Sequence, residues 1–324
     1  MTIEQWRRHA EGFSWQTFTF SAQWEDAGGQ RRSRGFAVRR EPEDGLLAPY
    51  DIEGQYALHE HLEKCGSIPV PPLLWLERDP RALGMPFYVM ERVDGHVPVP
   101  WDPADPVLSS ERSRRILGLS FVDVLAGIHS MPIDGSLPPL ARPSRPQRAG
   151  LEALELWYSA YERAARSRLP LVEAAASWLR RNPHSSGCLC LCHGDYRVGN
   201  VMVDQTMQIN AVFDWELAHI GDPVSDIAWA ALRLFRGRSP RWSHLLEESE
   251  FLARYRERTG ILVDRQVLAF WTTVSCLKAI ANHLRAAQAF EQGRAGDLRL
   301  AAMGHQVVFL LRLLREHLHE QRAL

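Results

Sequence analysis

The chain has 324 residues, of which 45% are hydrophobic, so it can bury a large core, and a chain of this length favours two lobes over one. Its formal net charge of −1 provides no bulk field to recruit nucleic acid or an anionic membrane. There is no basic and apolar leader pattern, and no apolar run reaches the roughly 18 residues of a membrane-spanning helix. We therefore expect a cytoplasmic protein, monomeric or homodimeric, without a membrane or nucleic-acid partner.

The first third of the sequence predicts a small antiparallel sheet and one helix. The expected strands are 13–23, 34–40, 73–76 and 84–93, and the expected helix is 51–62. A turn at 26–29 lets the first two strands form a hairpin. Its basic run 31–34 could contact nucleic acid, but nothing aromatic interleaves it to stack bases, so we interpret it as a solvated hairpin edge.

The rest of the chain is expected to be mostly helical. The helices predicted by spacing are 110–131, 151–166, 169–181, 227–235, 243–259, 264–288 and 298–321. Three apolar runs between them predict buried strands at 188–192, 201–203 and 209–213. Cys188, Cys190 and Cys192 alternate along the first of these, lack a zinc-site spacing, and are interpreted as small core residues.

The loop between these strands carries the densest chemistry. Asp195 can accept or orient the proton of an attacking hydroxyl, while Asn200 and Asp214 supply the hard oxygen ligands that Mg²⁺ prefers. The five-residue spacing from Asp195 to Asn200 is that of the kinase catalytic loop. Asp and Asn also favour turns between strands, but the whole ordered set favours phosphoryl transfer.

These residues resemble a known family. The motifs that match the aminoglycoside phosphotransferase-like kinases, and especially the branch related to kinase domains fused to acyl-CoA dehydrogenases, are His193-Gly194-Asp195, Asn200, Asp214-Trp215-Glu216, Gly221-Asp222-Pro223, Asp226 and the segment 86–95. The resemblance implies an α+β, two-lobed protein-kinase-like fold with a small antiparallel-sheet N-lobe and a mostly helical C-lobe. We expect the nucleotide-binding lobe, with the hinge at its end, at 1–93 and the catalytic and acceptor-binding lobe at 94–324.

The resemblance also implies roles in the C-lobe and the hinge. Asp195 would be the catalytic carboxylate, and we place Arg197 of the same loop beside it as a second candidate catalytic residue. Asn200 and Asp214 would hold Mg²⁺, with ATP as co-substrate. The backbone from Glu91 to Val93 would meet the adenine. In addition, Asp222 and Asp226 would brace the loop from below.

In the N-lobe the family pattern is only partly kept. The expected phosphate loop is 11–15, in which Ser14 is a candidate ligand and Trp15 stands where the family usually has asparagine. A kinase normally places a lysine on the following strand, but only two of the 38 lysines and arginines are lysines, Lys64 and Lys278. Arg39 is therefore the expected phosphate-binding cation. Gln55 is its expected helix partner, where the family usually has glutamate, with Glu53 and Glu60 as alternatives.

The acceptor is expected to meet the late helices. From residue 231 to 324 there are fifteen lysines and arginines against nine acidic residues, which suggests a neutral or anionic acceptor rather than a polycationic aminoglycoside. A hydroxyacyl-CoA or related metabolite would fit, its phosphates meeting arginines among Arg233, Arg236, Arg238 and Arg285. These arginines can equally be ordinary solvated helix faces. The alternative function is a nucleotide-binding pseudokinase that acts as a scaffold or sensor, suggested by Gln55 and the altered phosphate loop.

Overall fold

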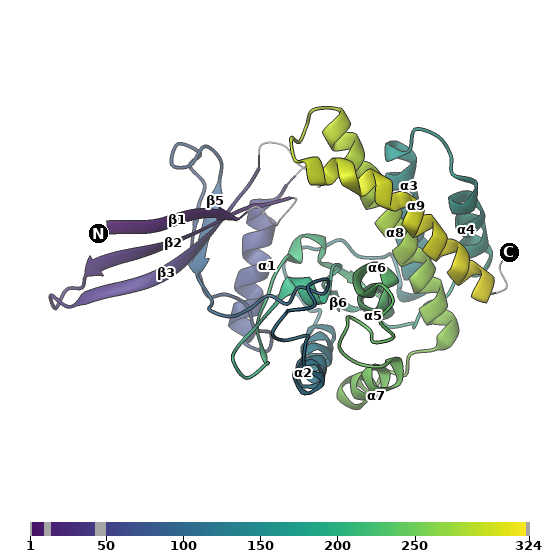
Figure 1. Ribbon diagram of the computed structural model, residues 1–324, viewed down its shortest axis with the longest axis horizontal. Helices are drawn as coiled ribbons and strands as arrows, with labels where there is room; N and C mark the ends of the chain where they lie inside the picture. Colours follow the sequence, from purple (N-terminus) through teal and green to yellow (C-terminus); the bar gives the residue numbers. More distant parts are fainter. Residues whose placement is uncertain (1, 10–13, 43–49, 322–324) are drawn as a thin grey trace.

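An antiparallel sheet and a helical region lie side by side in the computed structural model, which describes residues 2–9, 14–42 and 50–321 (Figure 1). The sheet has five strands in the order β1-β2-β3-β5-β4, and each paired strand runs antiparallel to its neighbour. Its elements are β1 (Thr2–His9), β2 (Gln16–Glu25), β3 (Arg31–Arg40), β4 (Leu73–Glu77) and β5 (Phe87–Glu91), with helix α1 (Ile52–Cys65) beside it. The expected α+β fold class with an antiparallel N-terminal sheet is confirmed.

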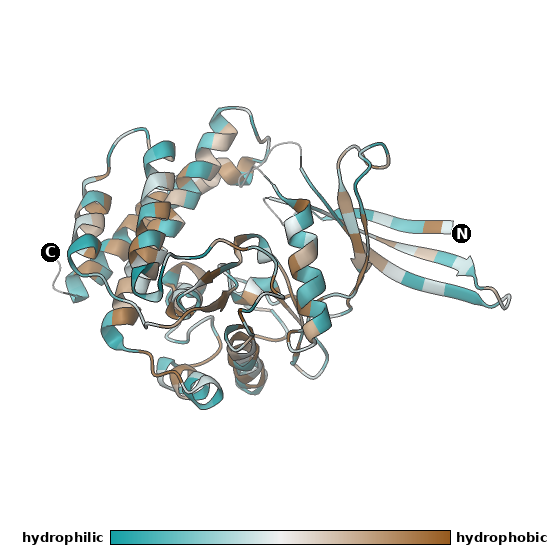
Figure 2. Ribbon diagram, turned by 180° about the vertical axis from the view of Figure 1, so that it is seen from behind, coloured by the Kyte–Doolittle hydropathy of each residue, from teal (hydrophilic) through white to brown (hydrophobic). Residues whose placement is uncertain are grey.

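The predicted hairpin is formed by β2 and β3, which pair over their full length. Asp26 shapes the turn because its carboxylate accepts the backbone N–H groups of Gly28 and Gln30 at 3.0 and 2.9 Å. The basic run at 31–34 is exposed, and Arg32 pairs with Asp26. Figure 2 shows the mostly hydrophilic outer part of these strands projecting from the rest of the molecule.

Strand β1 was not expected. It is exposed along almost its whole length and has no buried face to produce an alternating pattern. Trp6 anchors it by stacking on Phe18 and Phe20, with ring centroids 5.3 and 5.5 Å apart. A register shift between Glu4 and Arg7, where Gln5 has a φ of 56°, breaks the strand period further.

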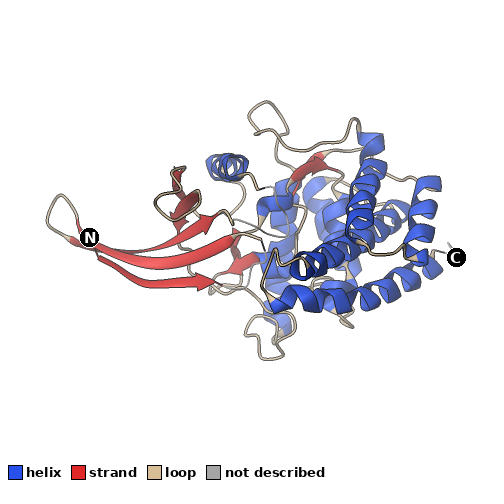
Figure 3. Cartoon of the chain, turned by 90° about the horizontal axis from the view of Figure 1, so that it is seen from above, coloured by secondary structure: helices blue, strands red, loops and turns tan. Residues whose placement is uncertain are grey.

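The helical region gathers around helix α8, which is buried on most sides (Figure 3). Its helices are α2 (Glu111–His129), α3 (Ala149–Ala164), α4 (Pro170–Arg181), α5 (Val224–Ala231), α6 (Arg233–Arg236), α7 (Glu248–Thr259), α8 (Arg265–Glu291) and α9 (Leu298–Glu320). One apolar core joins α2, α7 and the short strands between residues 190 and 221, and a second joins α3, α4, α5, α8 and α9. None of the helices in the described ranges is both long and apolar enough to cross a membrane.

Side-chain caps explain why several helix starts were predictable. Asp51 accepts the Gly54 N–H at 2.9 Å at the start of α1, and Asp264 accepts the Gln266 N–H at 2.7 Å at the start of α8. The predicted single helix over 227–235 was wrong. Leu232 is extended, with φ −63° and ψ 134°, and separates α5 from α6.

Four short strands carry the catalytic loop. They are β6 (Cys190–Cys192), β7 (Val201–Val203), β8 (Ile209–Val212) and β9 (His219–Gly221), and they pair as β6 with β9 and β7 with β8. The prediction that Cys188 belongs to the first strand and to the core was wrong, since it is exposed and precedes β6. The partner strand β9 has only three residues, so the ladder ends at Cys190.

Candidate active site

The two short strand pairs bring the predicted loop residues together. Asn200 precedes β7 and Phe213 follows β8, and these strands pair Val201 with Val212. The Phe213 N–H therefore donates to the Asn200 carbonyl at 2.9 Å, which places Asp214 next to Asn200 in space. The ring of His193, at the end of β6, contacts the Phe213 carbonyl at 2.8 Å. Segments 20 residues apart in the sequence are thus tied to one point.

Asp226 holds the backbone of the loop from below. Its buried carboxylate accepts the N–H groups of His193 and Gly194 at 2.7 and 2.9 Å. Gly194 has a φ of 81°, and a Cβ there would lie 2.2 Å from the Leu217 carbonyl oxygen, so only glycine fits. Asp222 accepts the N–H groups of Ser186 and Val224 at 2.6 and 3.0 Å, which fixes the segments before β6 and after β9.

The carboxylate of Asp195 is held at both oxygens. Trp229 Nε1 donates to Oδ1 at 2.6 Å, and Asn200 Nδ2 donates to Oδ2 at 2.8 Å. Arg197 lies beside it, with Nε 3.4 Å from Oδ2, and its guanidinium carbon is 5.8 Å from the Phe235 ring centroid. The Asp195 side chain keeps an exposed fraction of 21%, so a substrate hydroxyl can reach it.

Asn200 and Asp214 fit a hard divalent cation chemically. The Asn200 amide nitrogen donates to the Asp195 carbonyl and carboxylate, so among the described residues its oxygen keeps its lone pairs. One oxygen of Asp214 accepts from Arg39 at 2.8 Å, which leaves the other, and the side chain is 38% exposed. Asp214 has a φ of 62°, an uncommon conformation that Asp tolerates. One amide and one carboxylate oxygen are a typical protein contribution to a Mg²⁺ site.

Arg39 is buried and joins the sheet to this loop. Its Nη2 lies 2.8 Å from Asp214 and 3.8 Å from Glu216. Burial alone would lower the pKa of the guanidinium, but the carboxylate of Asp214, followed by the nearby Tyr88 phenol and by Glu216, raises it. The pKa of Asp214 is lowered because Arg39 and Arg197 outweigh its own burial.

Glu216 is the second carboxylate near Arg39. Burial, with the charge of Asp214 adding to it, raises the pKa of Glu216 to about 7. Ser14 Oγ donates to its two carboxylate oxygens at 2.8 and 2.6 Å. The predicted phosphate-loop serine thus sits at the contact between sheet and loop. Residues 11–13 of that predicted loop lie outside the described residues, whereas Trp15 is described.

Gln55 was expected to partner Arg39 and does not. In the part of the chain that the structure describes, Arg39 bonds to Asp214 instead, while Gln55 only shares a small cavity of about 20 Å³ with it. The alternatives point elsewhere, because Glu53 pairs with Arg78 and Glu60 pairs with Lys64. The helix-to-strand ion pair of the expected kinase pattern is therefore replaced by a strand-to-loop pair.

The predicted hinge residues lie at the end of β5. The Glu91 N–H donates to the Pro72 carbonyl at 2.8 Å, and its side chain pairs with Arg34 at 2.8 Å. Val93 comes two residues beyond the strand, and among the described residues its N–H has no hydrogen-bond partner. That free donor is suited to a nucleotide base.

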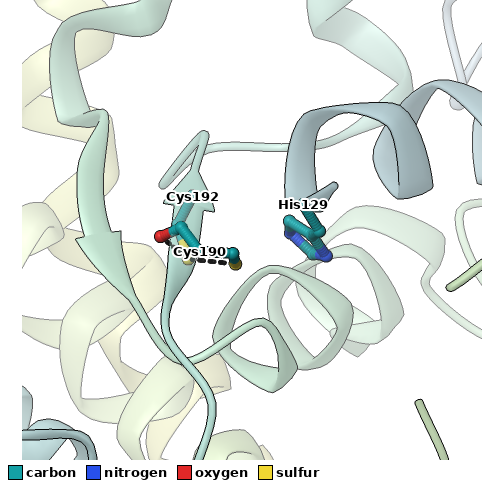
Figure 4. Close-up of side chains that lie close together, drawn as sticks. All are labelled: His129, Cys190 and Cys192. Atoms are coloured by element: carbon teal, nitrogen blue, oxygen red, sulfur yellow. Dashed lines mark hydrogen bonds between the residues drawn. The ribbon is translucent and has the colours of Figure 1, made fainter. Parts of the chain in front are cut away.

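A buried cluster of His129, Cys190 and Cys192 lies under the loop (Figure 4). The two sulfur atoms are 3.7 Å apart. His129 uses one ring nitrogen for Tyr255 Oη at 2.7 Å and the other for Asp226 at 3.3 Å. Burial opposes protonation, but Cys190 and the bond to Asp226 raise the pKa of His129. Since both nitrogens are engaged, we interpret this cluster as support for Asp226.

Two contributors to the site, Trp229 and Lys278, were given no role from the sequence, and Trp15 was noted there only as a departure from the family pattern. Trp15 packs against Arg39, whose guanidinium carbon is 5.6 Å from the ring centroid. Trp229 bonds Asp195, and Lys278 donates to the carbonyl of Gly194. A signal did exist for Lys278, because a lysine inside the apolar run from 274 to 281 must be buried with a partner.

The sheet, the helical region and the His-Gly-Asp loop define a kinase-like phosphotransferase. Residues 6–271 match the family model of the APH phosphotransferase enzyme family, so the chain belongs to this family of small-molecule phosphotransferases with hydroxyl acceptors. Among curated proteins it is 31% identical over 246 residues to acyl-CoA dehydrogenase family member 11 from Rattus norvegicus. The match covers 72% of this chain and 31% of that relative, so the chain spans about a third of the relative's length.

Two solved structures illustrate the shared fold. A protein from Ralstonia eutropha described as an aminoglycoside phosphotransferase has a TM-score of 0.74 at 22% identity, covering 98% of this chain and 93% of that one. An aminoglycoside phosphotransferase in a ternary complex with ADP and hygromycin B has a TM-score of 0.57 at 15% identity, covering 96% and 95%. At these identities the likeness concerns the fold.

Proposed function

We propose that the chain transfers the γ-phosphoryl group of ATP to a hydroxyl group of a small molecule, with Mg²⁺ as cofactor. The observation that carries the proposal is the convergence of Asp195, Asn200, Asp214 and Arg39 at one point. A fold neighbour solved with ADP and hygromycin B supports a nucleotide co-substrate. The division into a nucleotide lobe, 1–93, and an acceptor lobe, 94–324, belongs to the same proposal.

The chemistry follows from these groups. The acceptor oxygen forms a bond to the γ-phosphorus as the bond to the β,γ-bridging oxygen breaks, so ADP leaves and the hydroxyl proton passes to Asp195. Asn200 and Asp214 would hold Mg²⁺, which neutralises charge on the phosphates when bound. Arg39 would steady the phosphates from the sheet, and Val93 would meet the adenine. Positioning and charge neutralisation supply most of the rate enhancement.

We propose a hydroxyacyl-CoA or a related anionic metabolite as the acceptor. The relatives named acyl-CoA dehydrogenases support a CoA thioester. Of the four arginines considered, Arg233 pairs with Glu316 at 2.8 Å and Arg236 donates to main-chain carbonyls, so both are engaged. Arg285 is a candidate on a different ground, the basic residues near it. Burial lowers the pKa of its guanidinium most, and the charges of Arg163 and Arg294 lower it further, so three cations lie near one another here.

The test is ADP release from Mg-ATP over a panel of acceptors. The panel contains 4-hydroxyacyl-CoA thioesters, free hydroxy acids, amino alcohols and aminoglycosides, with GTP as alternative donor and Asp195→Asn as the blank. We expect turnover with CoA thioesters, abolished in Asp195→Asn while Mg-ATP binding stays within about threefold. Turnover retained in that variant would remove Asp195 from its assigned role.

A second variant tests the proposed acceptor class independently of the phosphoryl-transfer reaction. Arg285→Met should raise KM for a CoA thioester and leave KM for the matching free hydroxy acid unchanged. An equal rise for both acceptors would contradict CoA-phosphate binding there. Mg-ATP binding without turnover of any acceptor would instead favour the pseudokinase.

A further inference from the structure

Lys278 is a buried cation directly beneath the catalytic loop. It lies in the middle of α8, has an exposed fraction of 8%, and follows Cys276 and Leu277 in an apolar run. Its ammonium group donates to the Gly194 carbonyl and lies 4.1 Å from the Trp229 ring centroid and 5.3 Å from that of Trp157. No carboxylate within the described ranges forms an ion pair with it. The cation is therefore satisfied by one carbonyl and two aromatic faces.

Trp229, on α5, links this cation to the reacting carboxylate. Its Nε1 donates to Asp195 Oδ1 at 2.6 Å, while the ring face receives Lys278. Lys278 thus acts on Asp195 by two routes, through the Gly194 carbonyl of the preceding peptide and through the indole that bonds its side chain.

A buried tryptophan in this core does not have to donate a hydrogen bond from its indole N–H. Trp271 on α8 is 3% exposed, against 5% for Trp229, and its Nε1 has no hydrogen-bond partner among the described residues. A buried indole can therefore stand in this core without a partner. The bond from Trp229 to Asp195 is a specific feature of the site.

We propose that Lys278 and Trp229 are positioning residues that hold the Asp195 carboxylate in the orientation needed to accept the acceptor proton. The inference rests on the proposed function, since it concerns the same carboxylate. Without the Trp229 donor, Oδ1 loses its restraint and the carboxylate can turn about the Cβ–Cγ bond. A misplacement of about 1 Å near reacting atoms can cost roughly 100-fold in rate.

The contact can be tested without any turnover. The chain has eleven tryptophans, so a ¹⁵N-tryptophan-labelled sample gives eleven indole N–H signals. Trp229→Phe removes and so assigns one of them. That signal should move in Asp195→Asn and in Lys278→Met. It should stay in place in Lys64→Met, the matched control, because Lys64 is 69% exposed and pairs with Glu60 on its own helix. An unmoved signal in both site variants would overturn the proposal.

The positioning role is tested by kinetics. Trp229→Phe and Lys278→Met should each lower kcat about 10- to 100-fold and leave KM for Mg-ATP unchanged. Trp271→Phe, the matched tryptophan control, should keep kcat.

The other outcomes distinguish the positioning role from the proposed function. Wild-type kcat in Trp229→Phe, or an equal loss of kcat in Trp271→Phe, would overturn the positioning role while leaving the proposed function intact. If Lys278→Met does not fold, the kcat of Trp229→Phe alone decides the role of the indole, and Lys278 is removed from the proposal. A wild-type protein that turns over no acceptor would overturn the proposed function and the positioning role with it, whatever the indole signals show.

Discussion

Replacing Asp226 by asparagine should be the most destabilising conservative change near the site. The carboxylate is 1% exposed and accepts from the His193 and Gly194 N–H groups and from the His129 ring at 2.7, 2.9 and 3.3 Å. An asparagine amide has one acceptor oxygen, so its NH₂ group would face one of these donors. His129 would also lose the charge that balances its own.

The magnitude follows from these contacts. Breaking a buried ion pair by removing one partner costs about 3–5 kcal/mol, and each lost hydrogen bond to a charged group costs about 1.5–3 kcal/mol. Loss of the Asp226–His129 ion pair is therefore the largest contribution to the loss of stability. With an unfolding entropy of ~2.1 cal/mol/K per residue over 324 residues, each kcal/mol lowers Tm by about 1.5 °C. We expect Tm to fall by roughly 4–8 °C if unfolding is two-state.

The assay is thermal and urea unfolding of Asp226→Asn beside Asp222→Asn. Asp222 is equally buried, and among the described residues its carboxylate accepts only from neutral groups, the N–H groups of Ser186 and Val224 and the Ser185 hydroxyl. Its replacement should cost about 1–3 kcal/mol, the penalty for an unsatisfied donor. If both variants lose the same stability, the charge of His129 contributes nothing and the reasoning fails.

The pH dependence gives an independent check. The folded-state pKa of Asp226 is depressed, because bonding and charge from His129 outweigh its burial, so its contribution is present above about pH 4 and is lost in acid. The pKa of His129 is raised, so its contribution is complete below about pH 6.5 and is lost as pH rises through the folded-state value. The difference in unfolding free energy between wild type and Asp226→Asn should therefore be largest between these limits. A difference that grows steadily toward pH 9 would contradict the assignment.

Three smaller changes separate the two sides of the site. Arg39→Met should weaken Mg-ATP binding at least about tenfold by isothermal calorimetry, since one charge-assisted bond is worth about 1.5–3 kcal/mol; unchanged affinity would exclude Arg39 as a phosphate ligand. Gln55→Glu should alter the affinity for Mg-ATP less than Arg39→Met does, because Gln55 does not bond Arg39. A larger effect would support the originally expected pairing of residue 55 with Arg39. Tyr196→Phe removes a buried bond to the Phe121 carbonyl, 2.8 Å long, and should cost about 1–2 kcal/mol in urea unfolding without changing KM.

The parts of the fold that were predictable depend on local signals. Helices α1 and α2 begin within a residue or two of their predicted starts because Asp51 and Ser110 cap them. Strand β1 gave no such signal, since its residues are mostly exposed and it is held by Trp6 against the neighbouring strand. No sequence signal marked the break between α5 and α6 at Leu232. Leucine favours a helix, and only the packing there makes the residue extended.

Some contacts of the site could also be predicted from local spacing, and others could not. Asp195 and Asn200 are five residues apart, and Asp214 reaches them through a single hairpin, so their proximity could be predicted from spacing. The contacts from Trp229 to Asp195 and from Lys278 to Gly194 could not be predicted from spacing, because these residues lie on separate helices 34 and 84 residues beyond their partners. The partner of Arg39 depends on how the sheet meets the helical region, which no local pattern encodes.

The two halves of the site are held by different means, and this should separate their effects on catalysis. Asp195 is fixed by Asn200 and Trp229 inside the helical region, over a loop whose backbone is bonded to the buried Asp226. The sheet reaches the loop through polar contacts instead, from Arg39 to Asp214 and from Ser14 to Glu216. Changes around Asp195 should therefore lower kcat, whereas changes in the polar contacts should act on Mg-ATP binding, because Arg39 and Ser14 belong to the proposed nucleotide lobe.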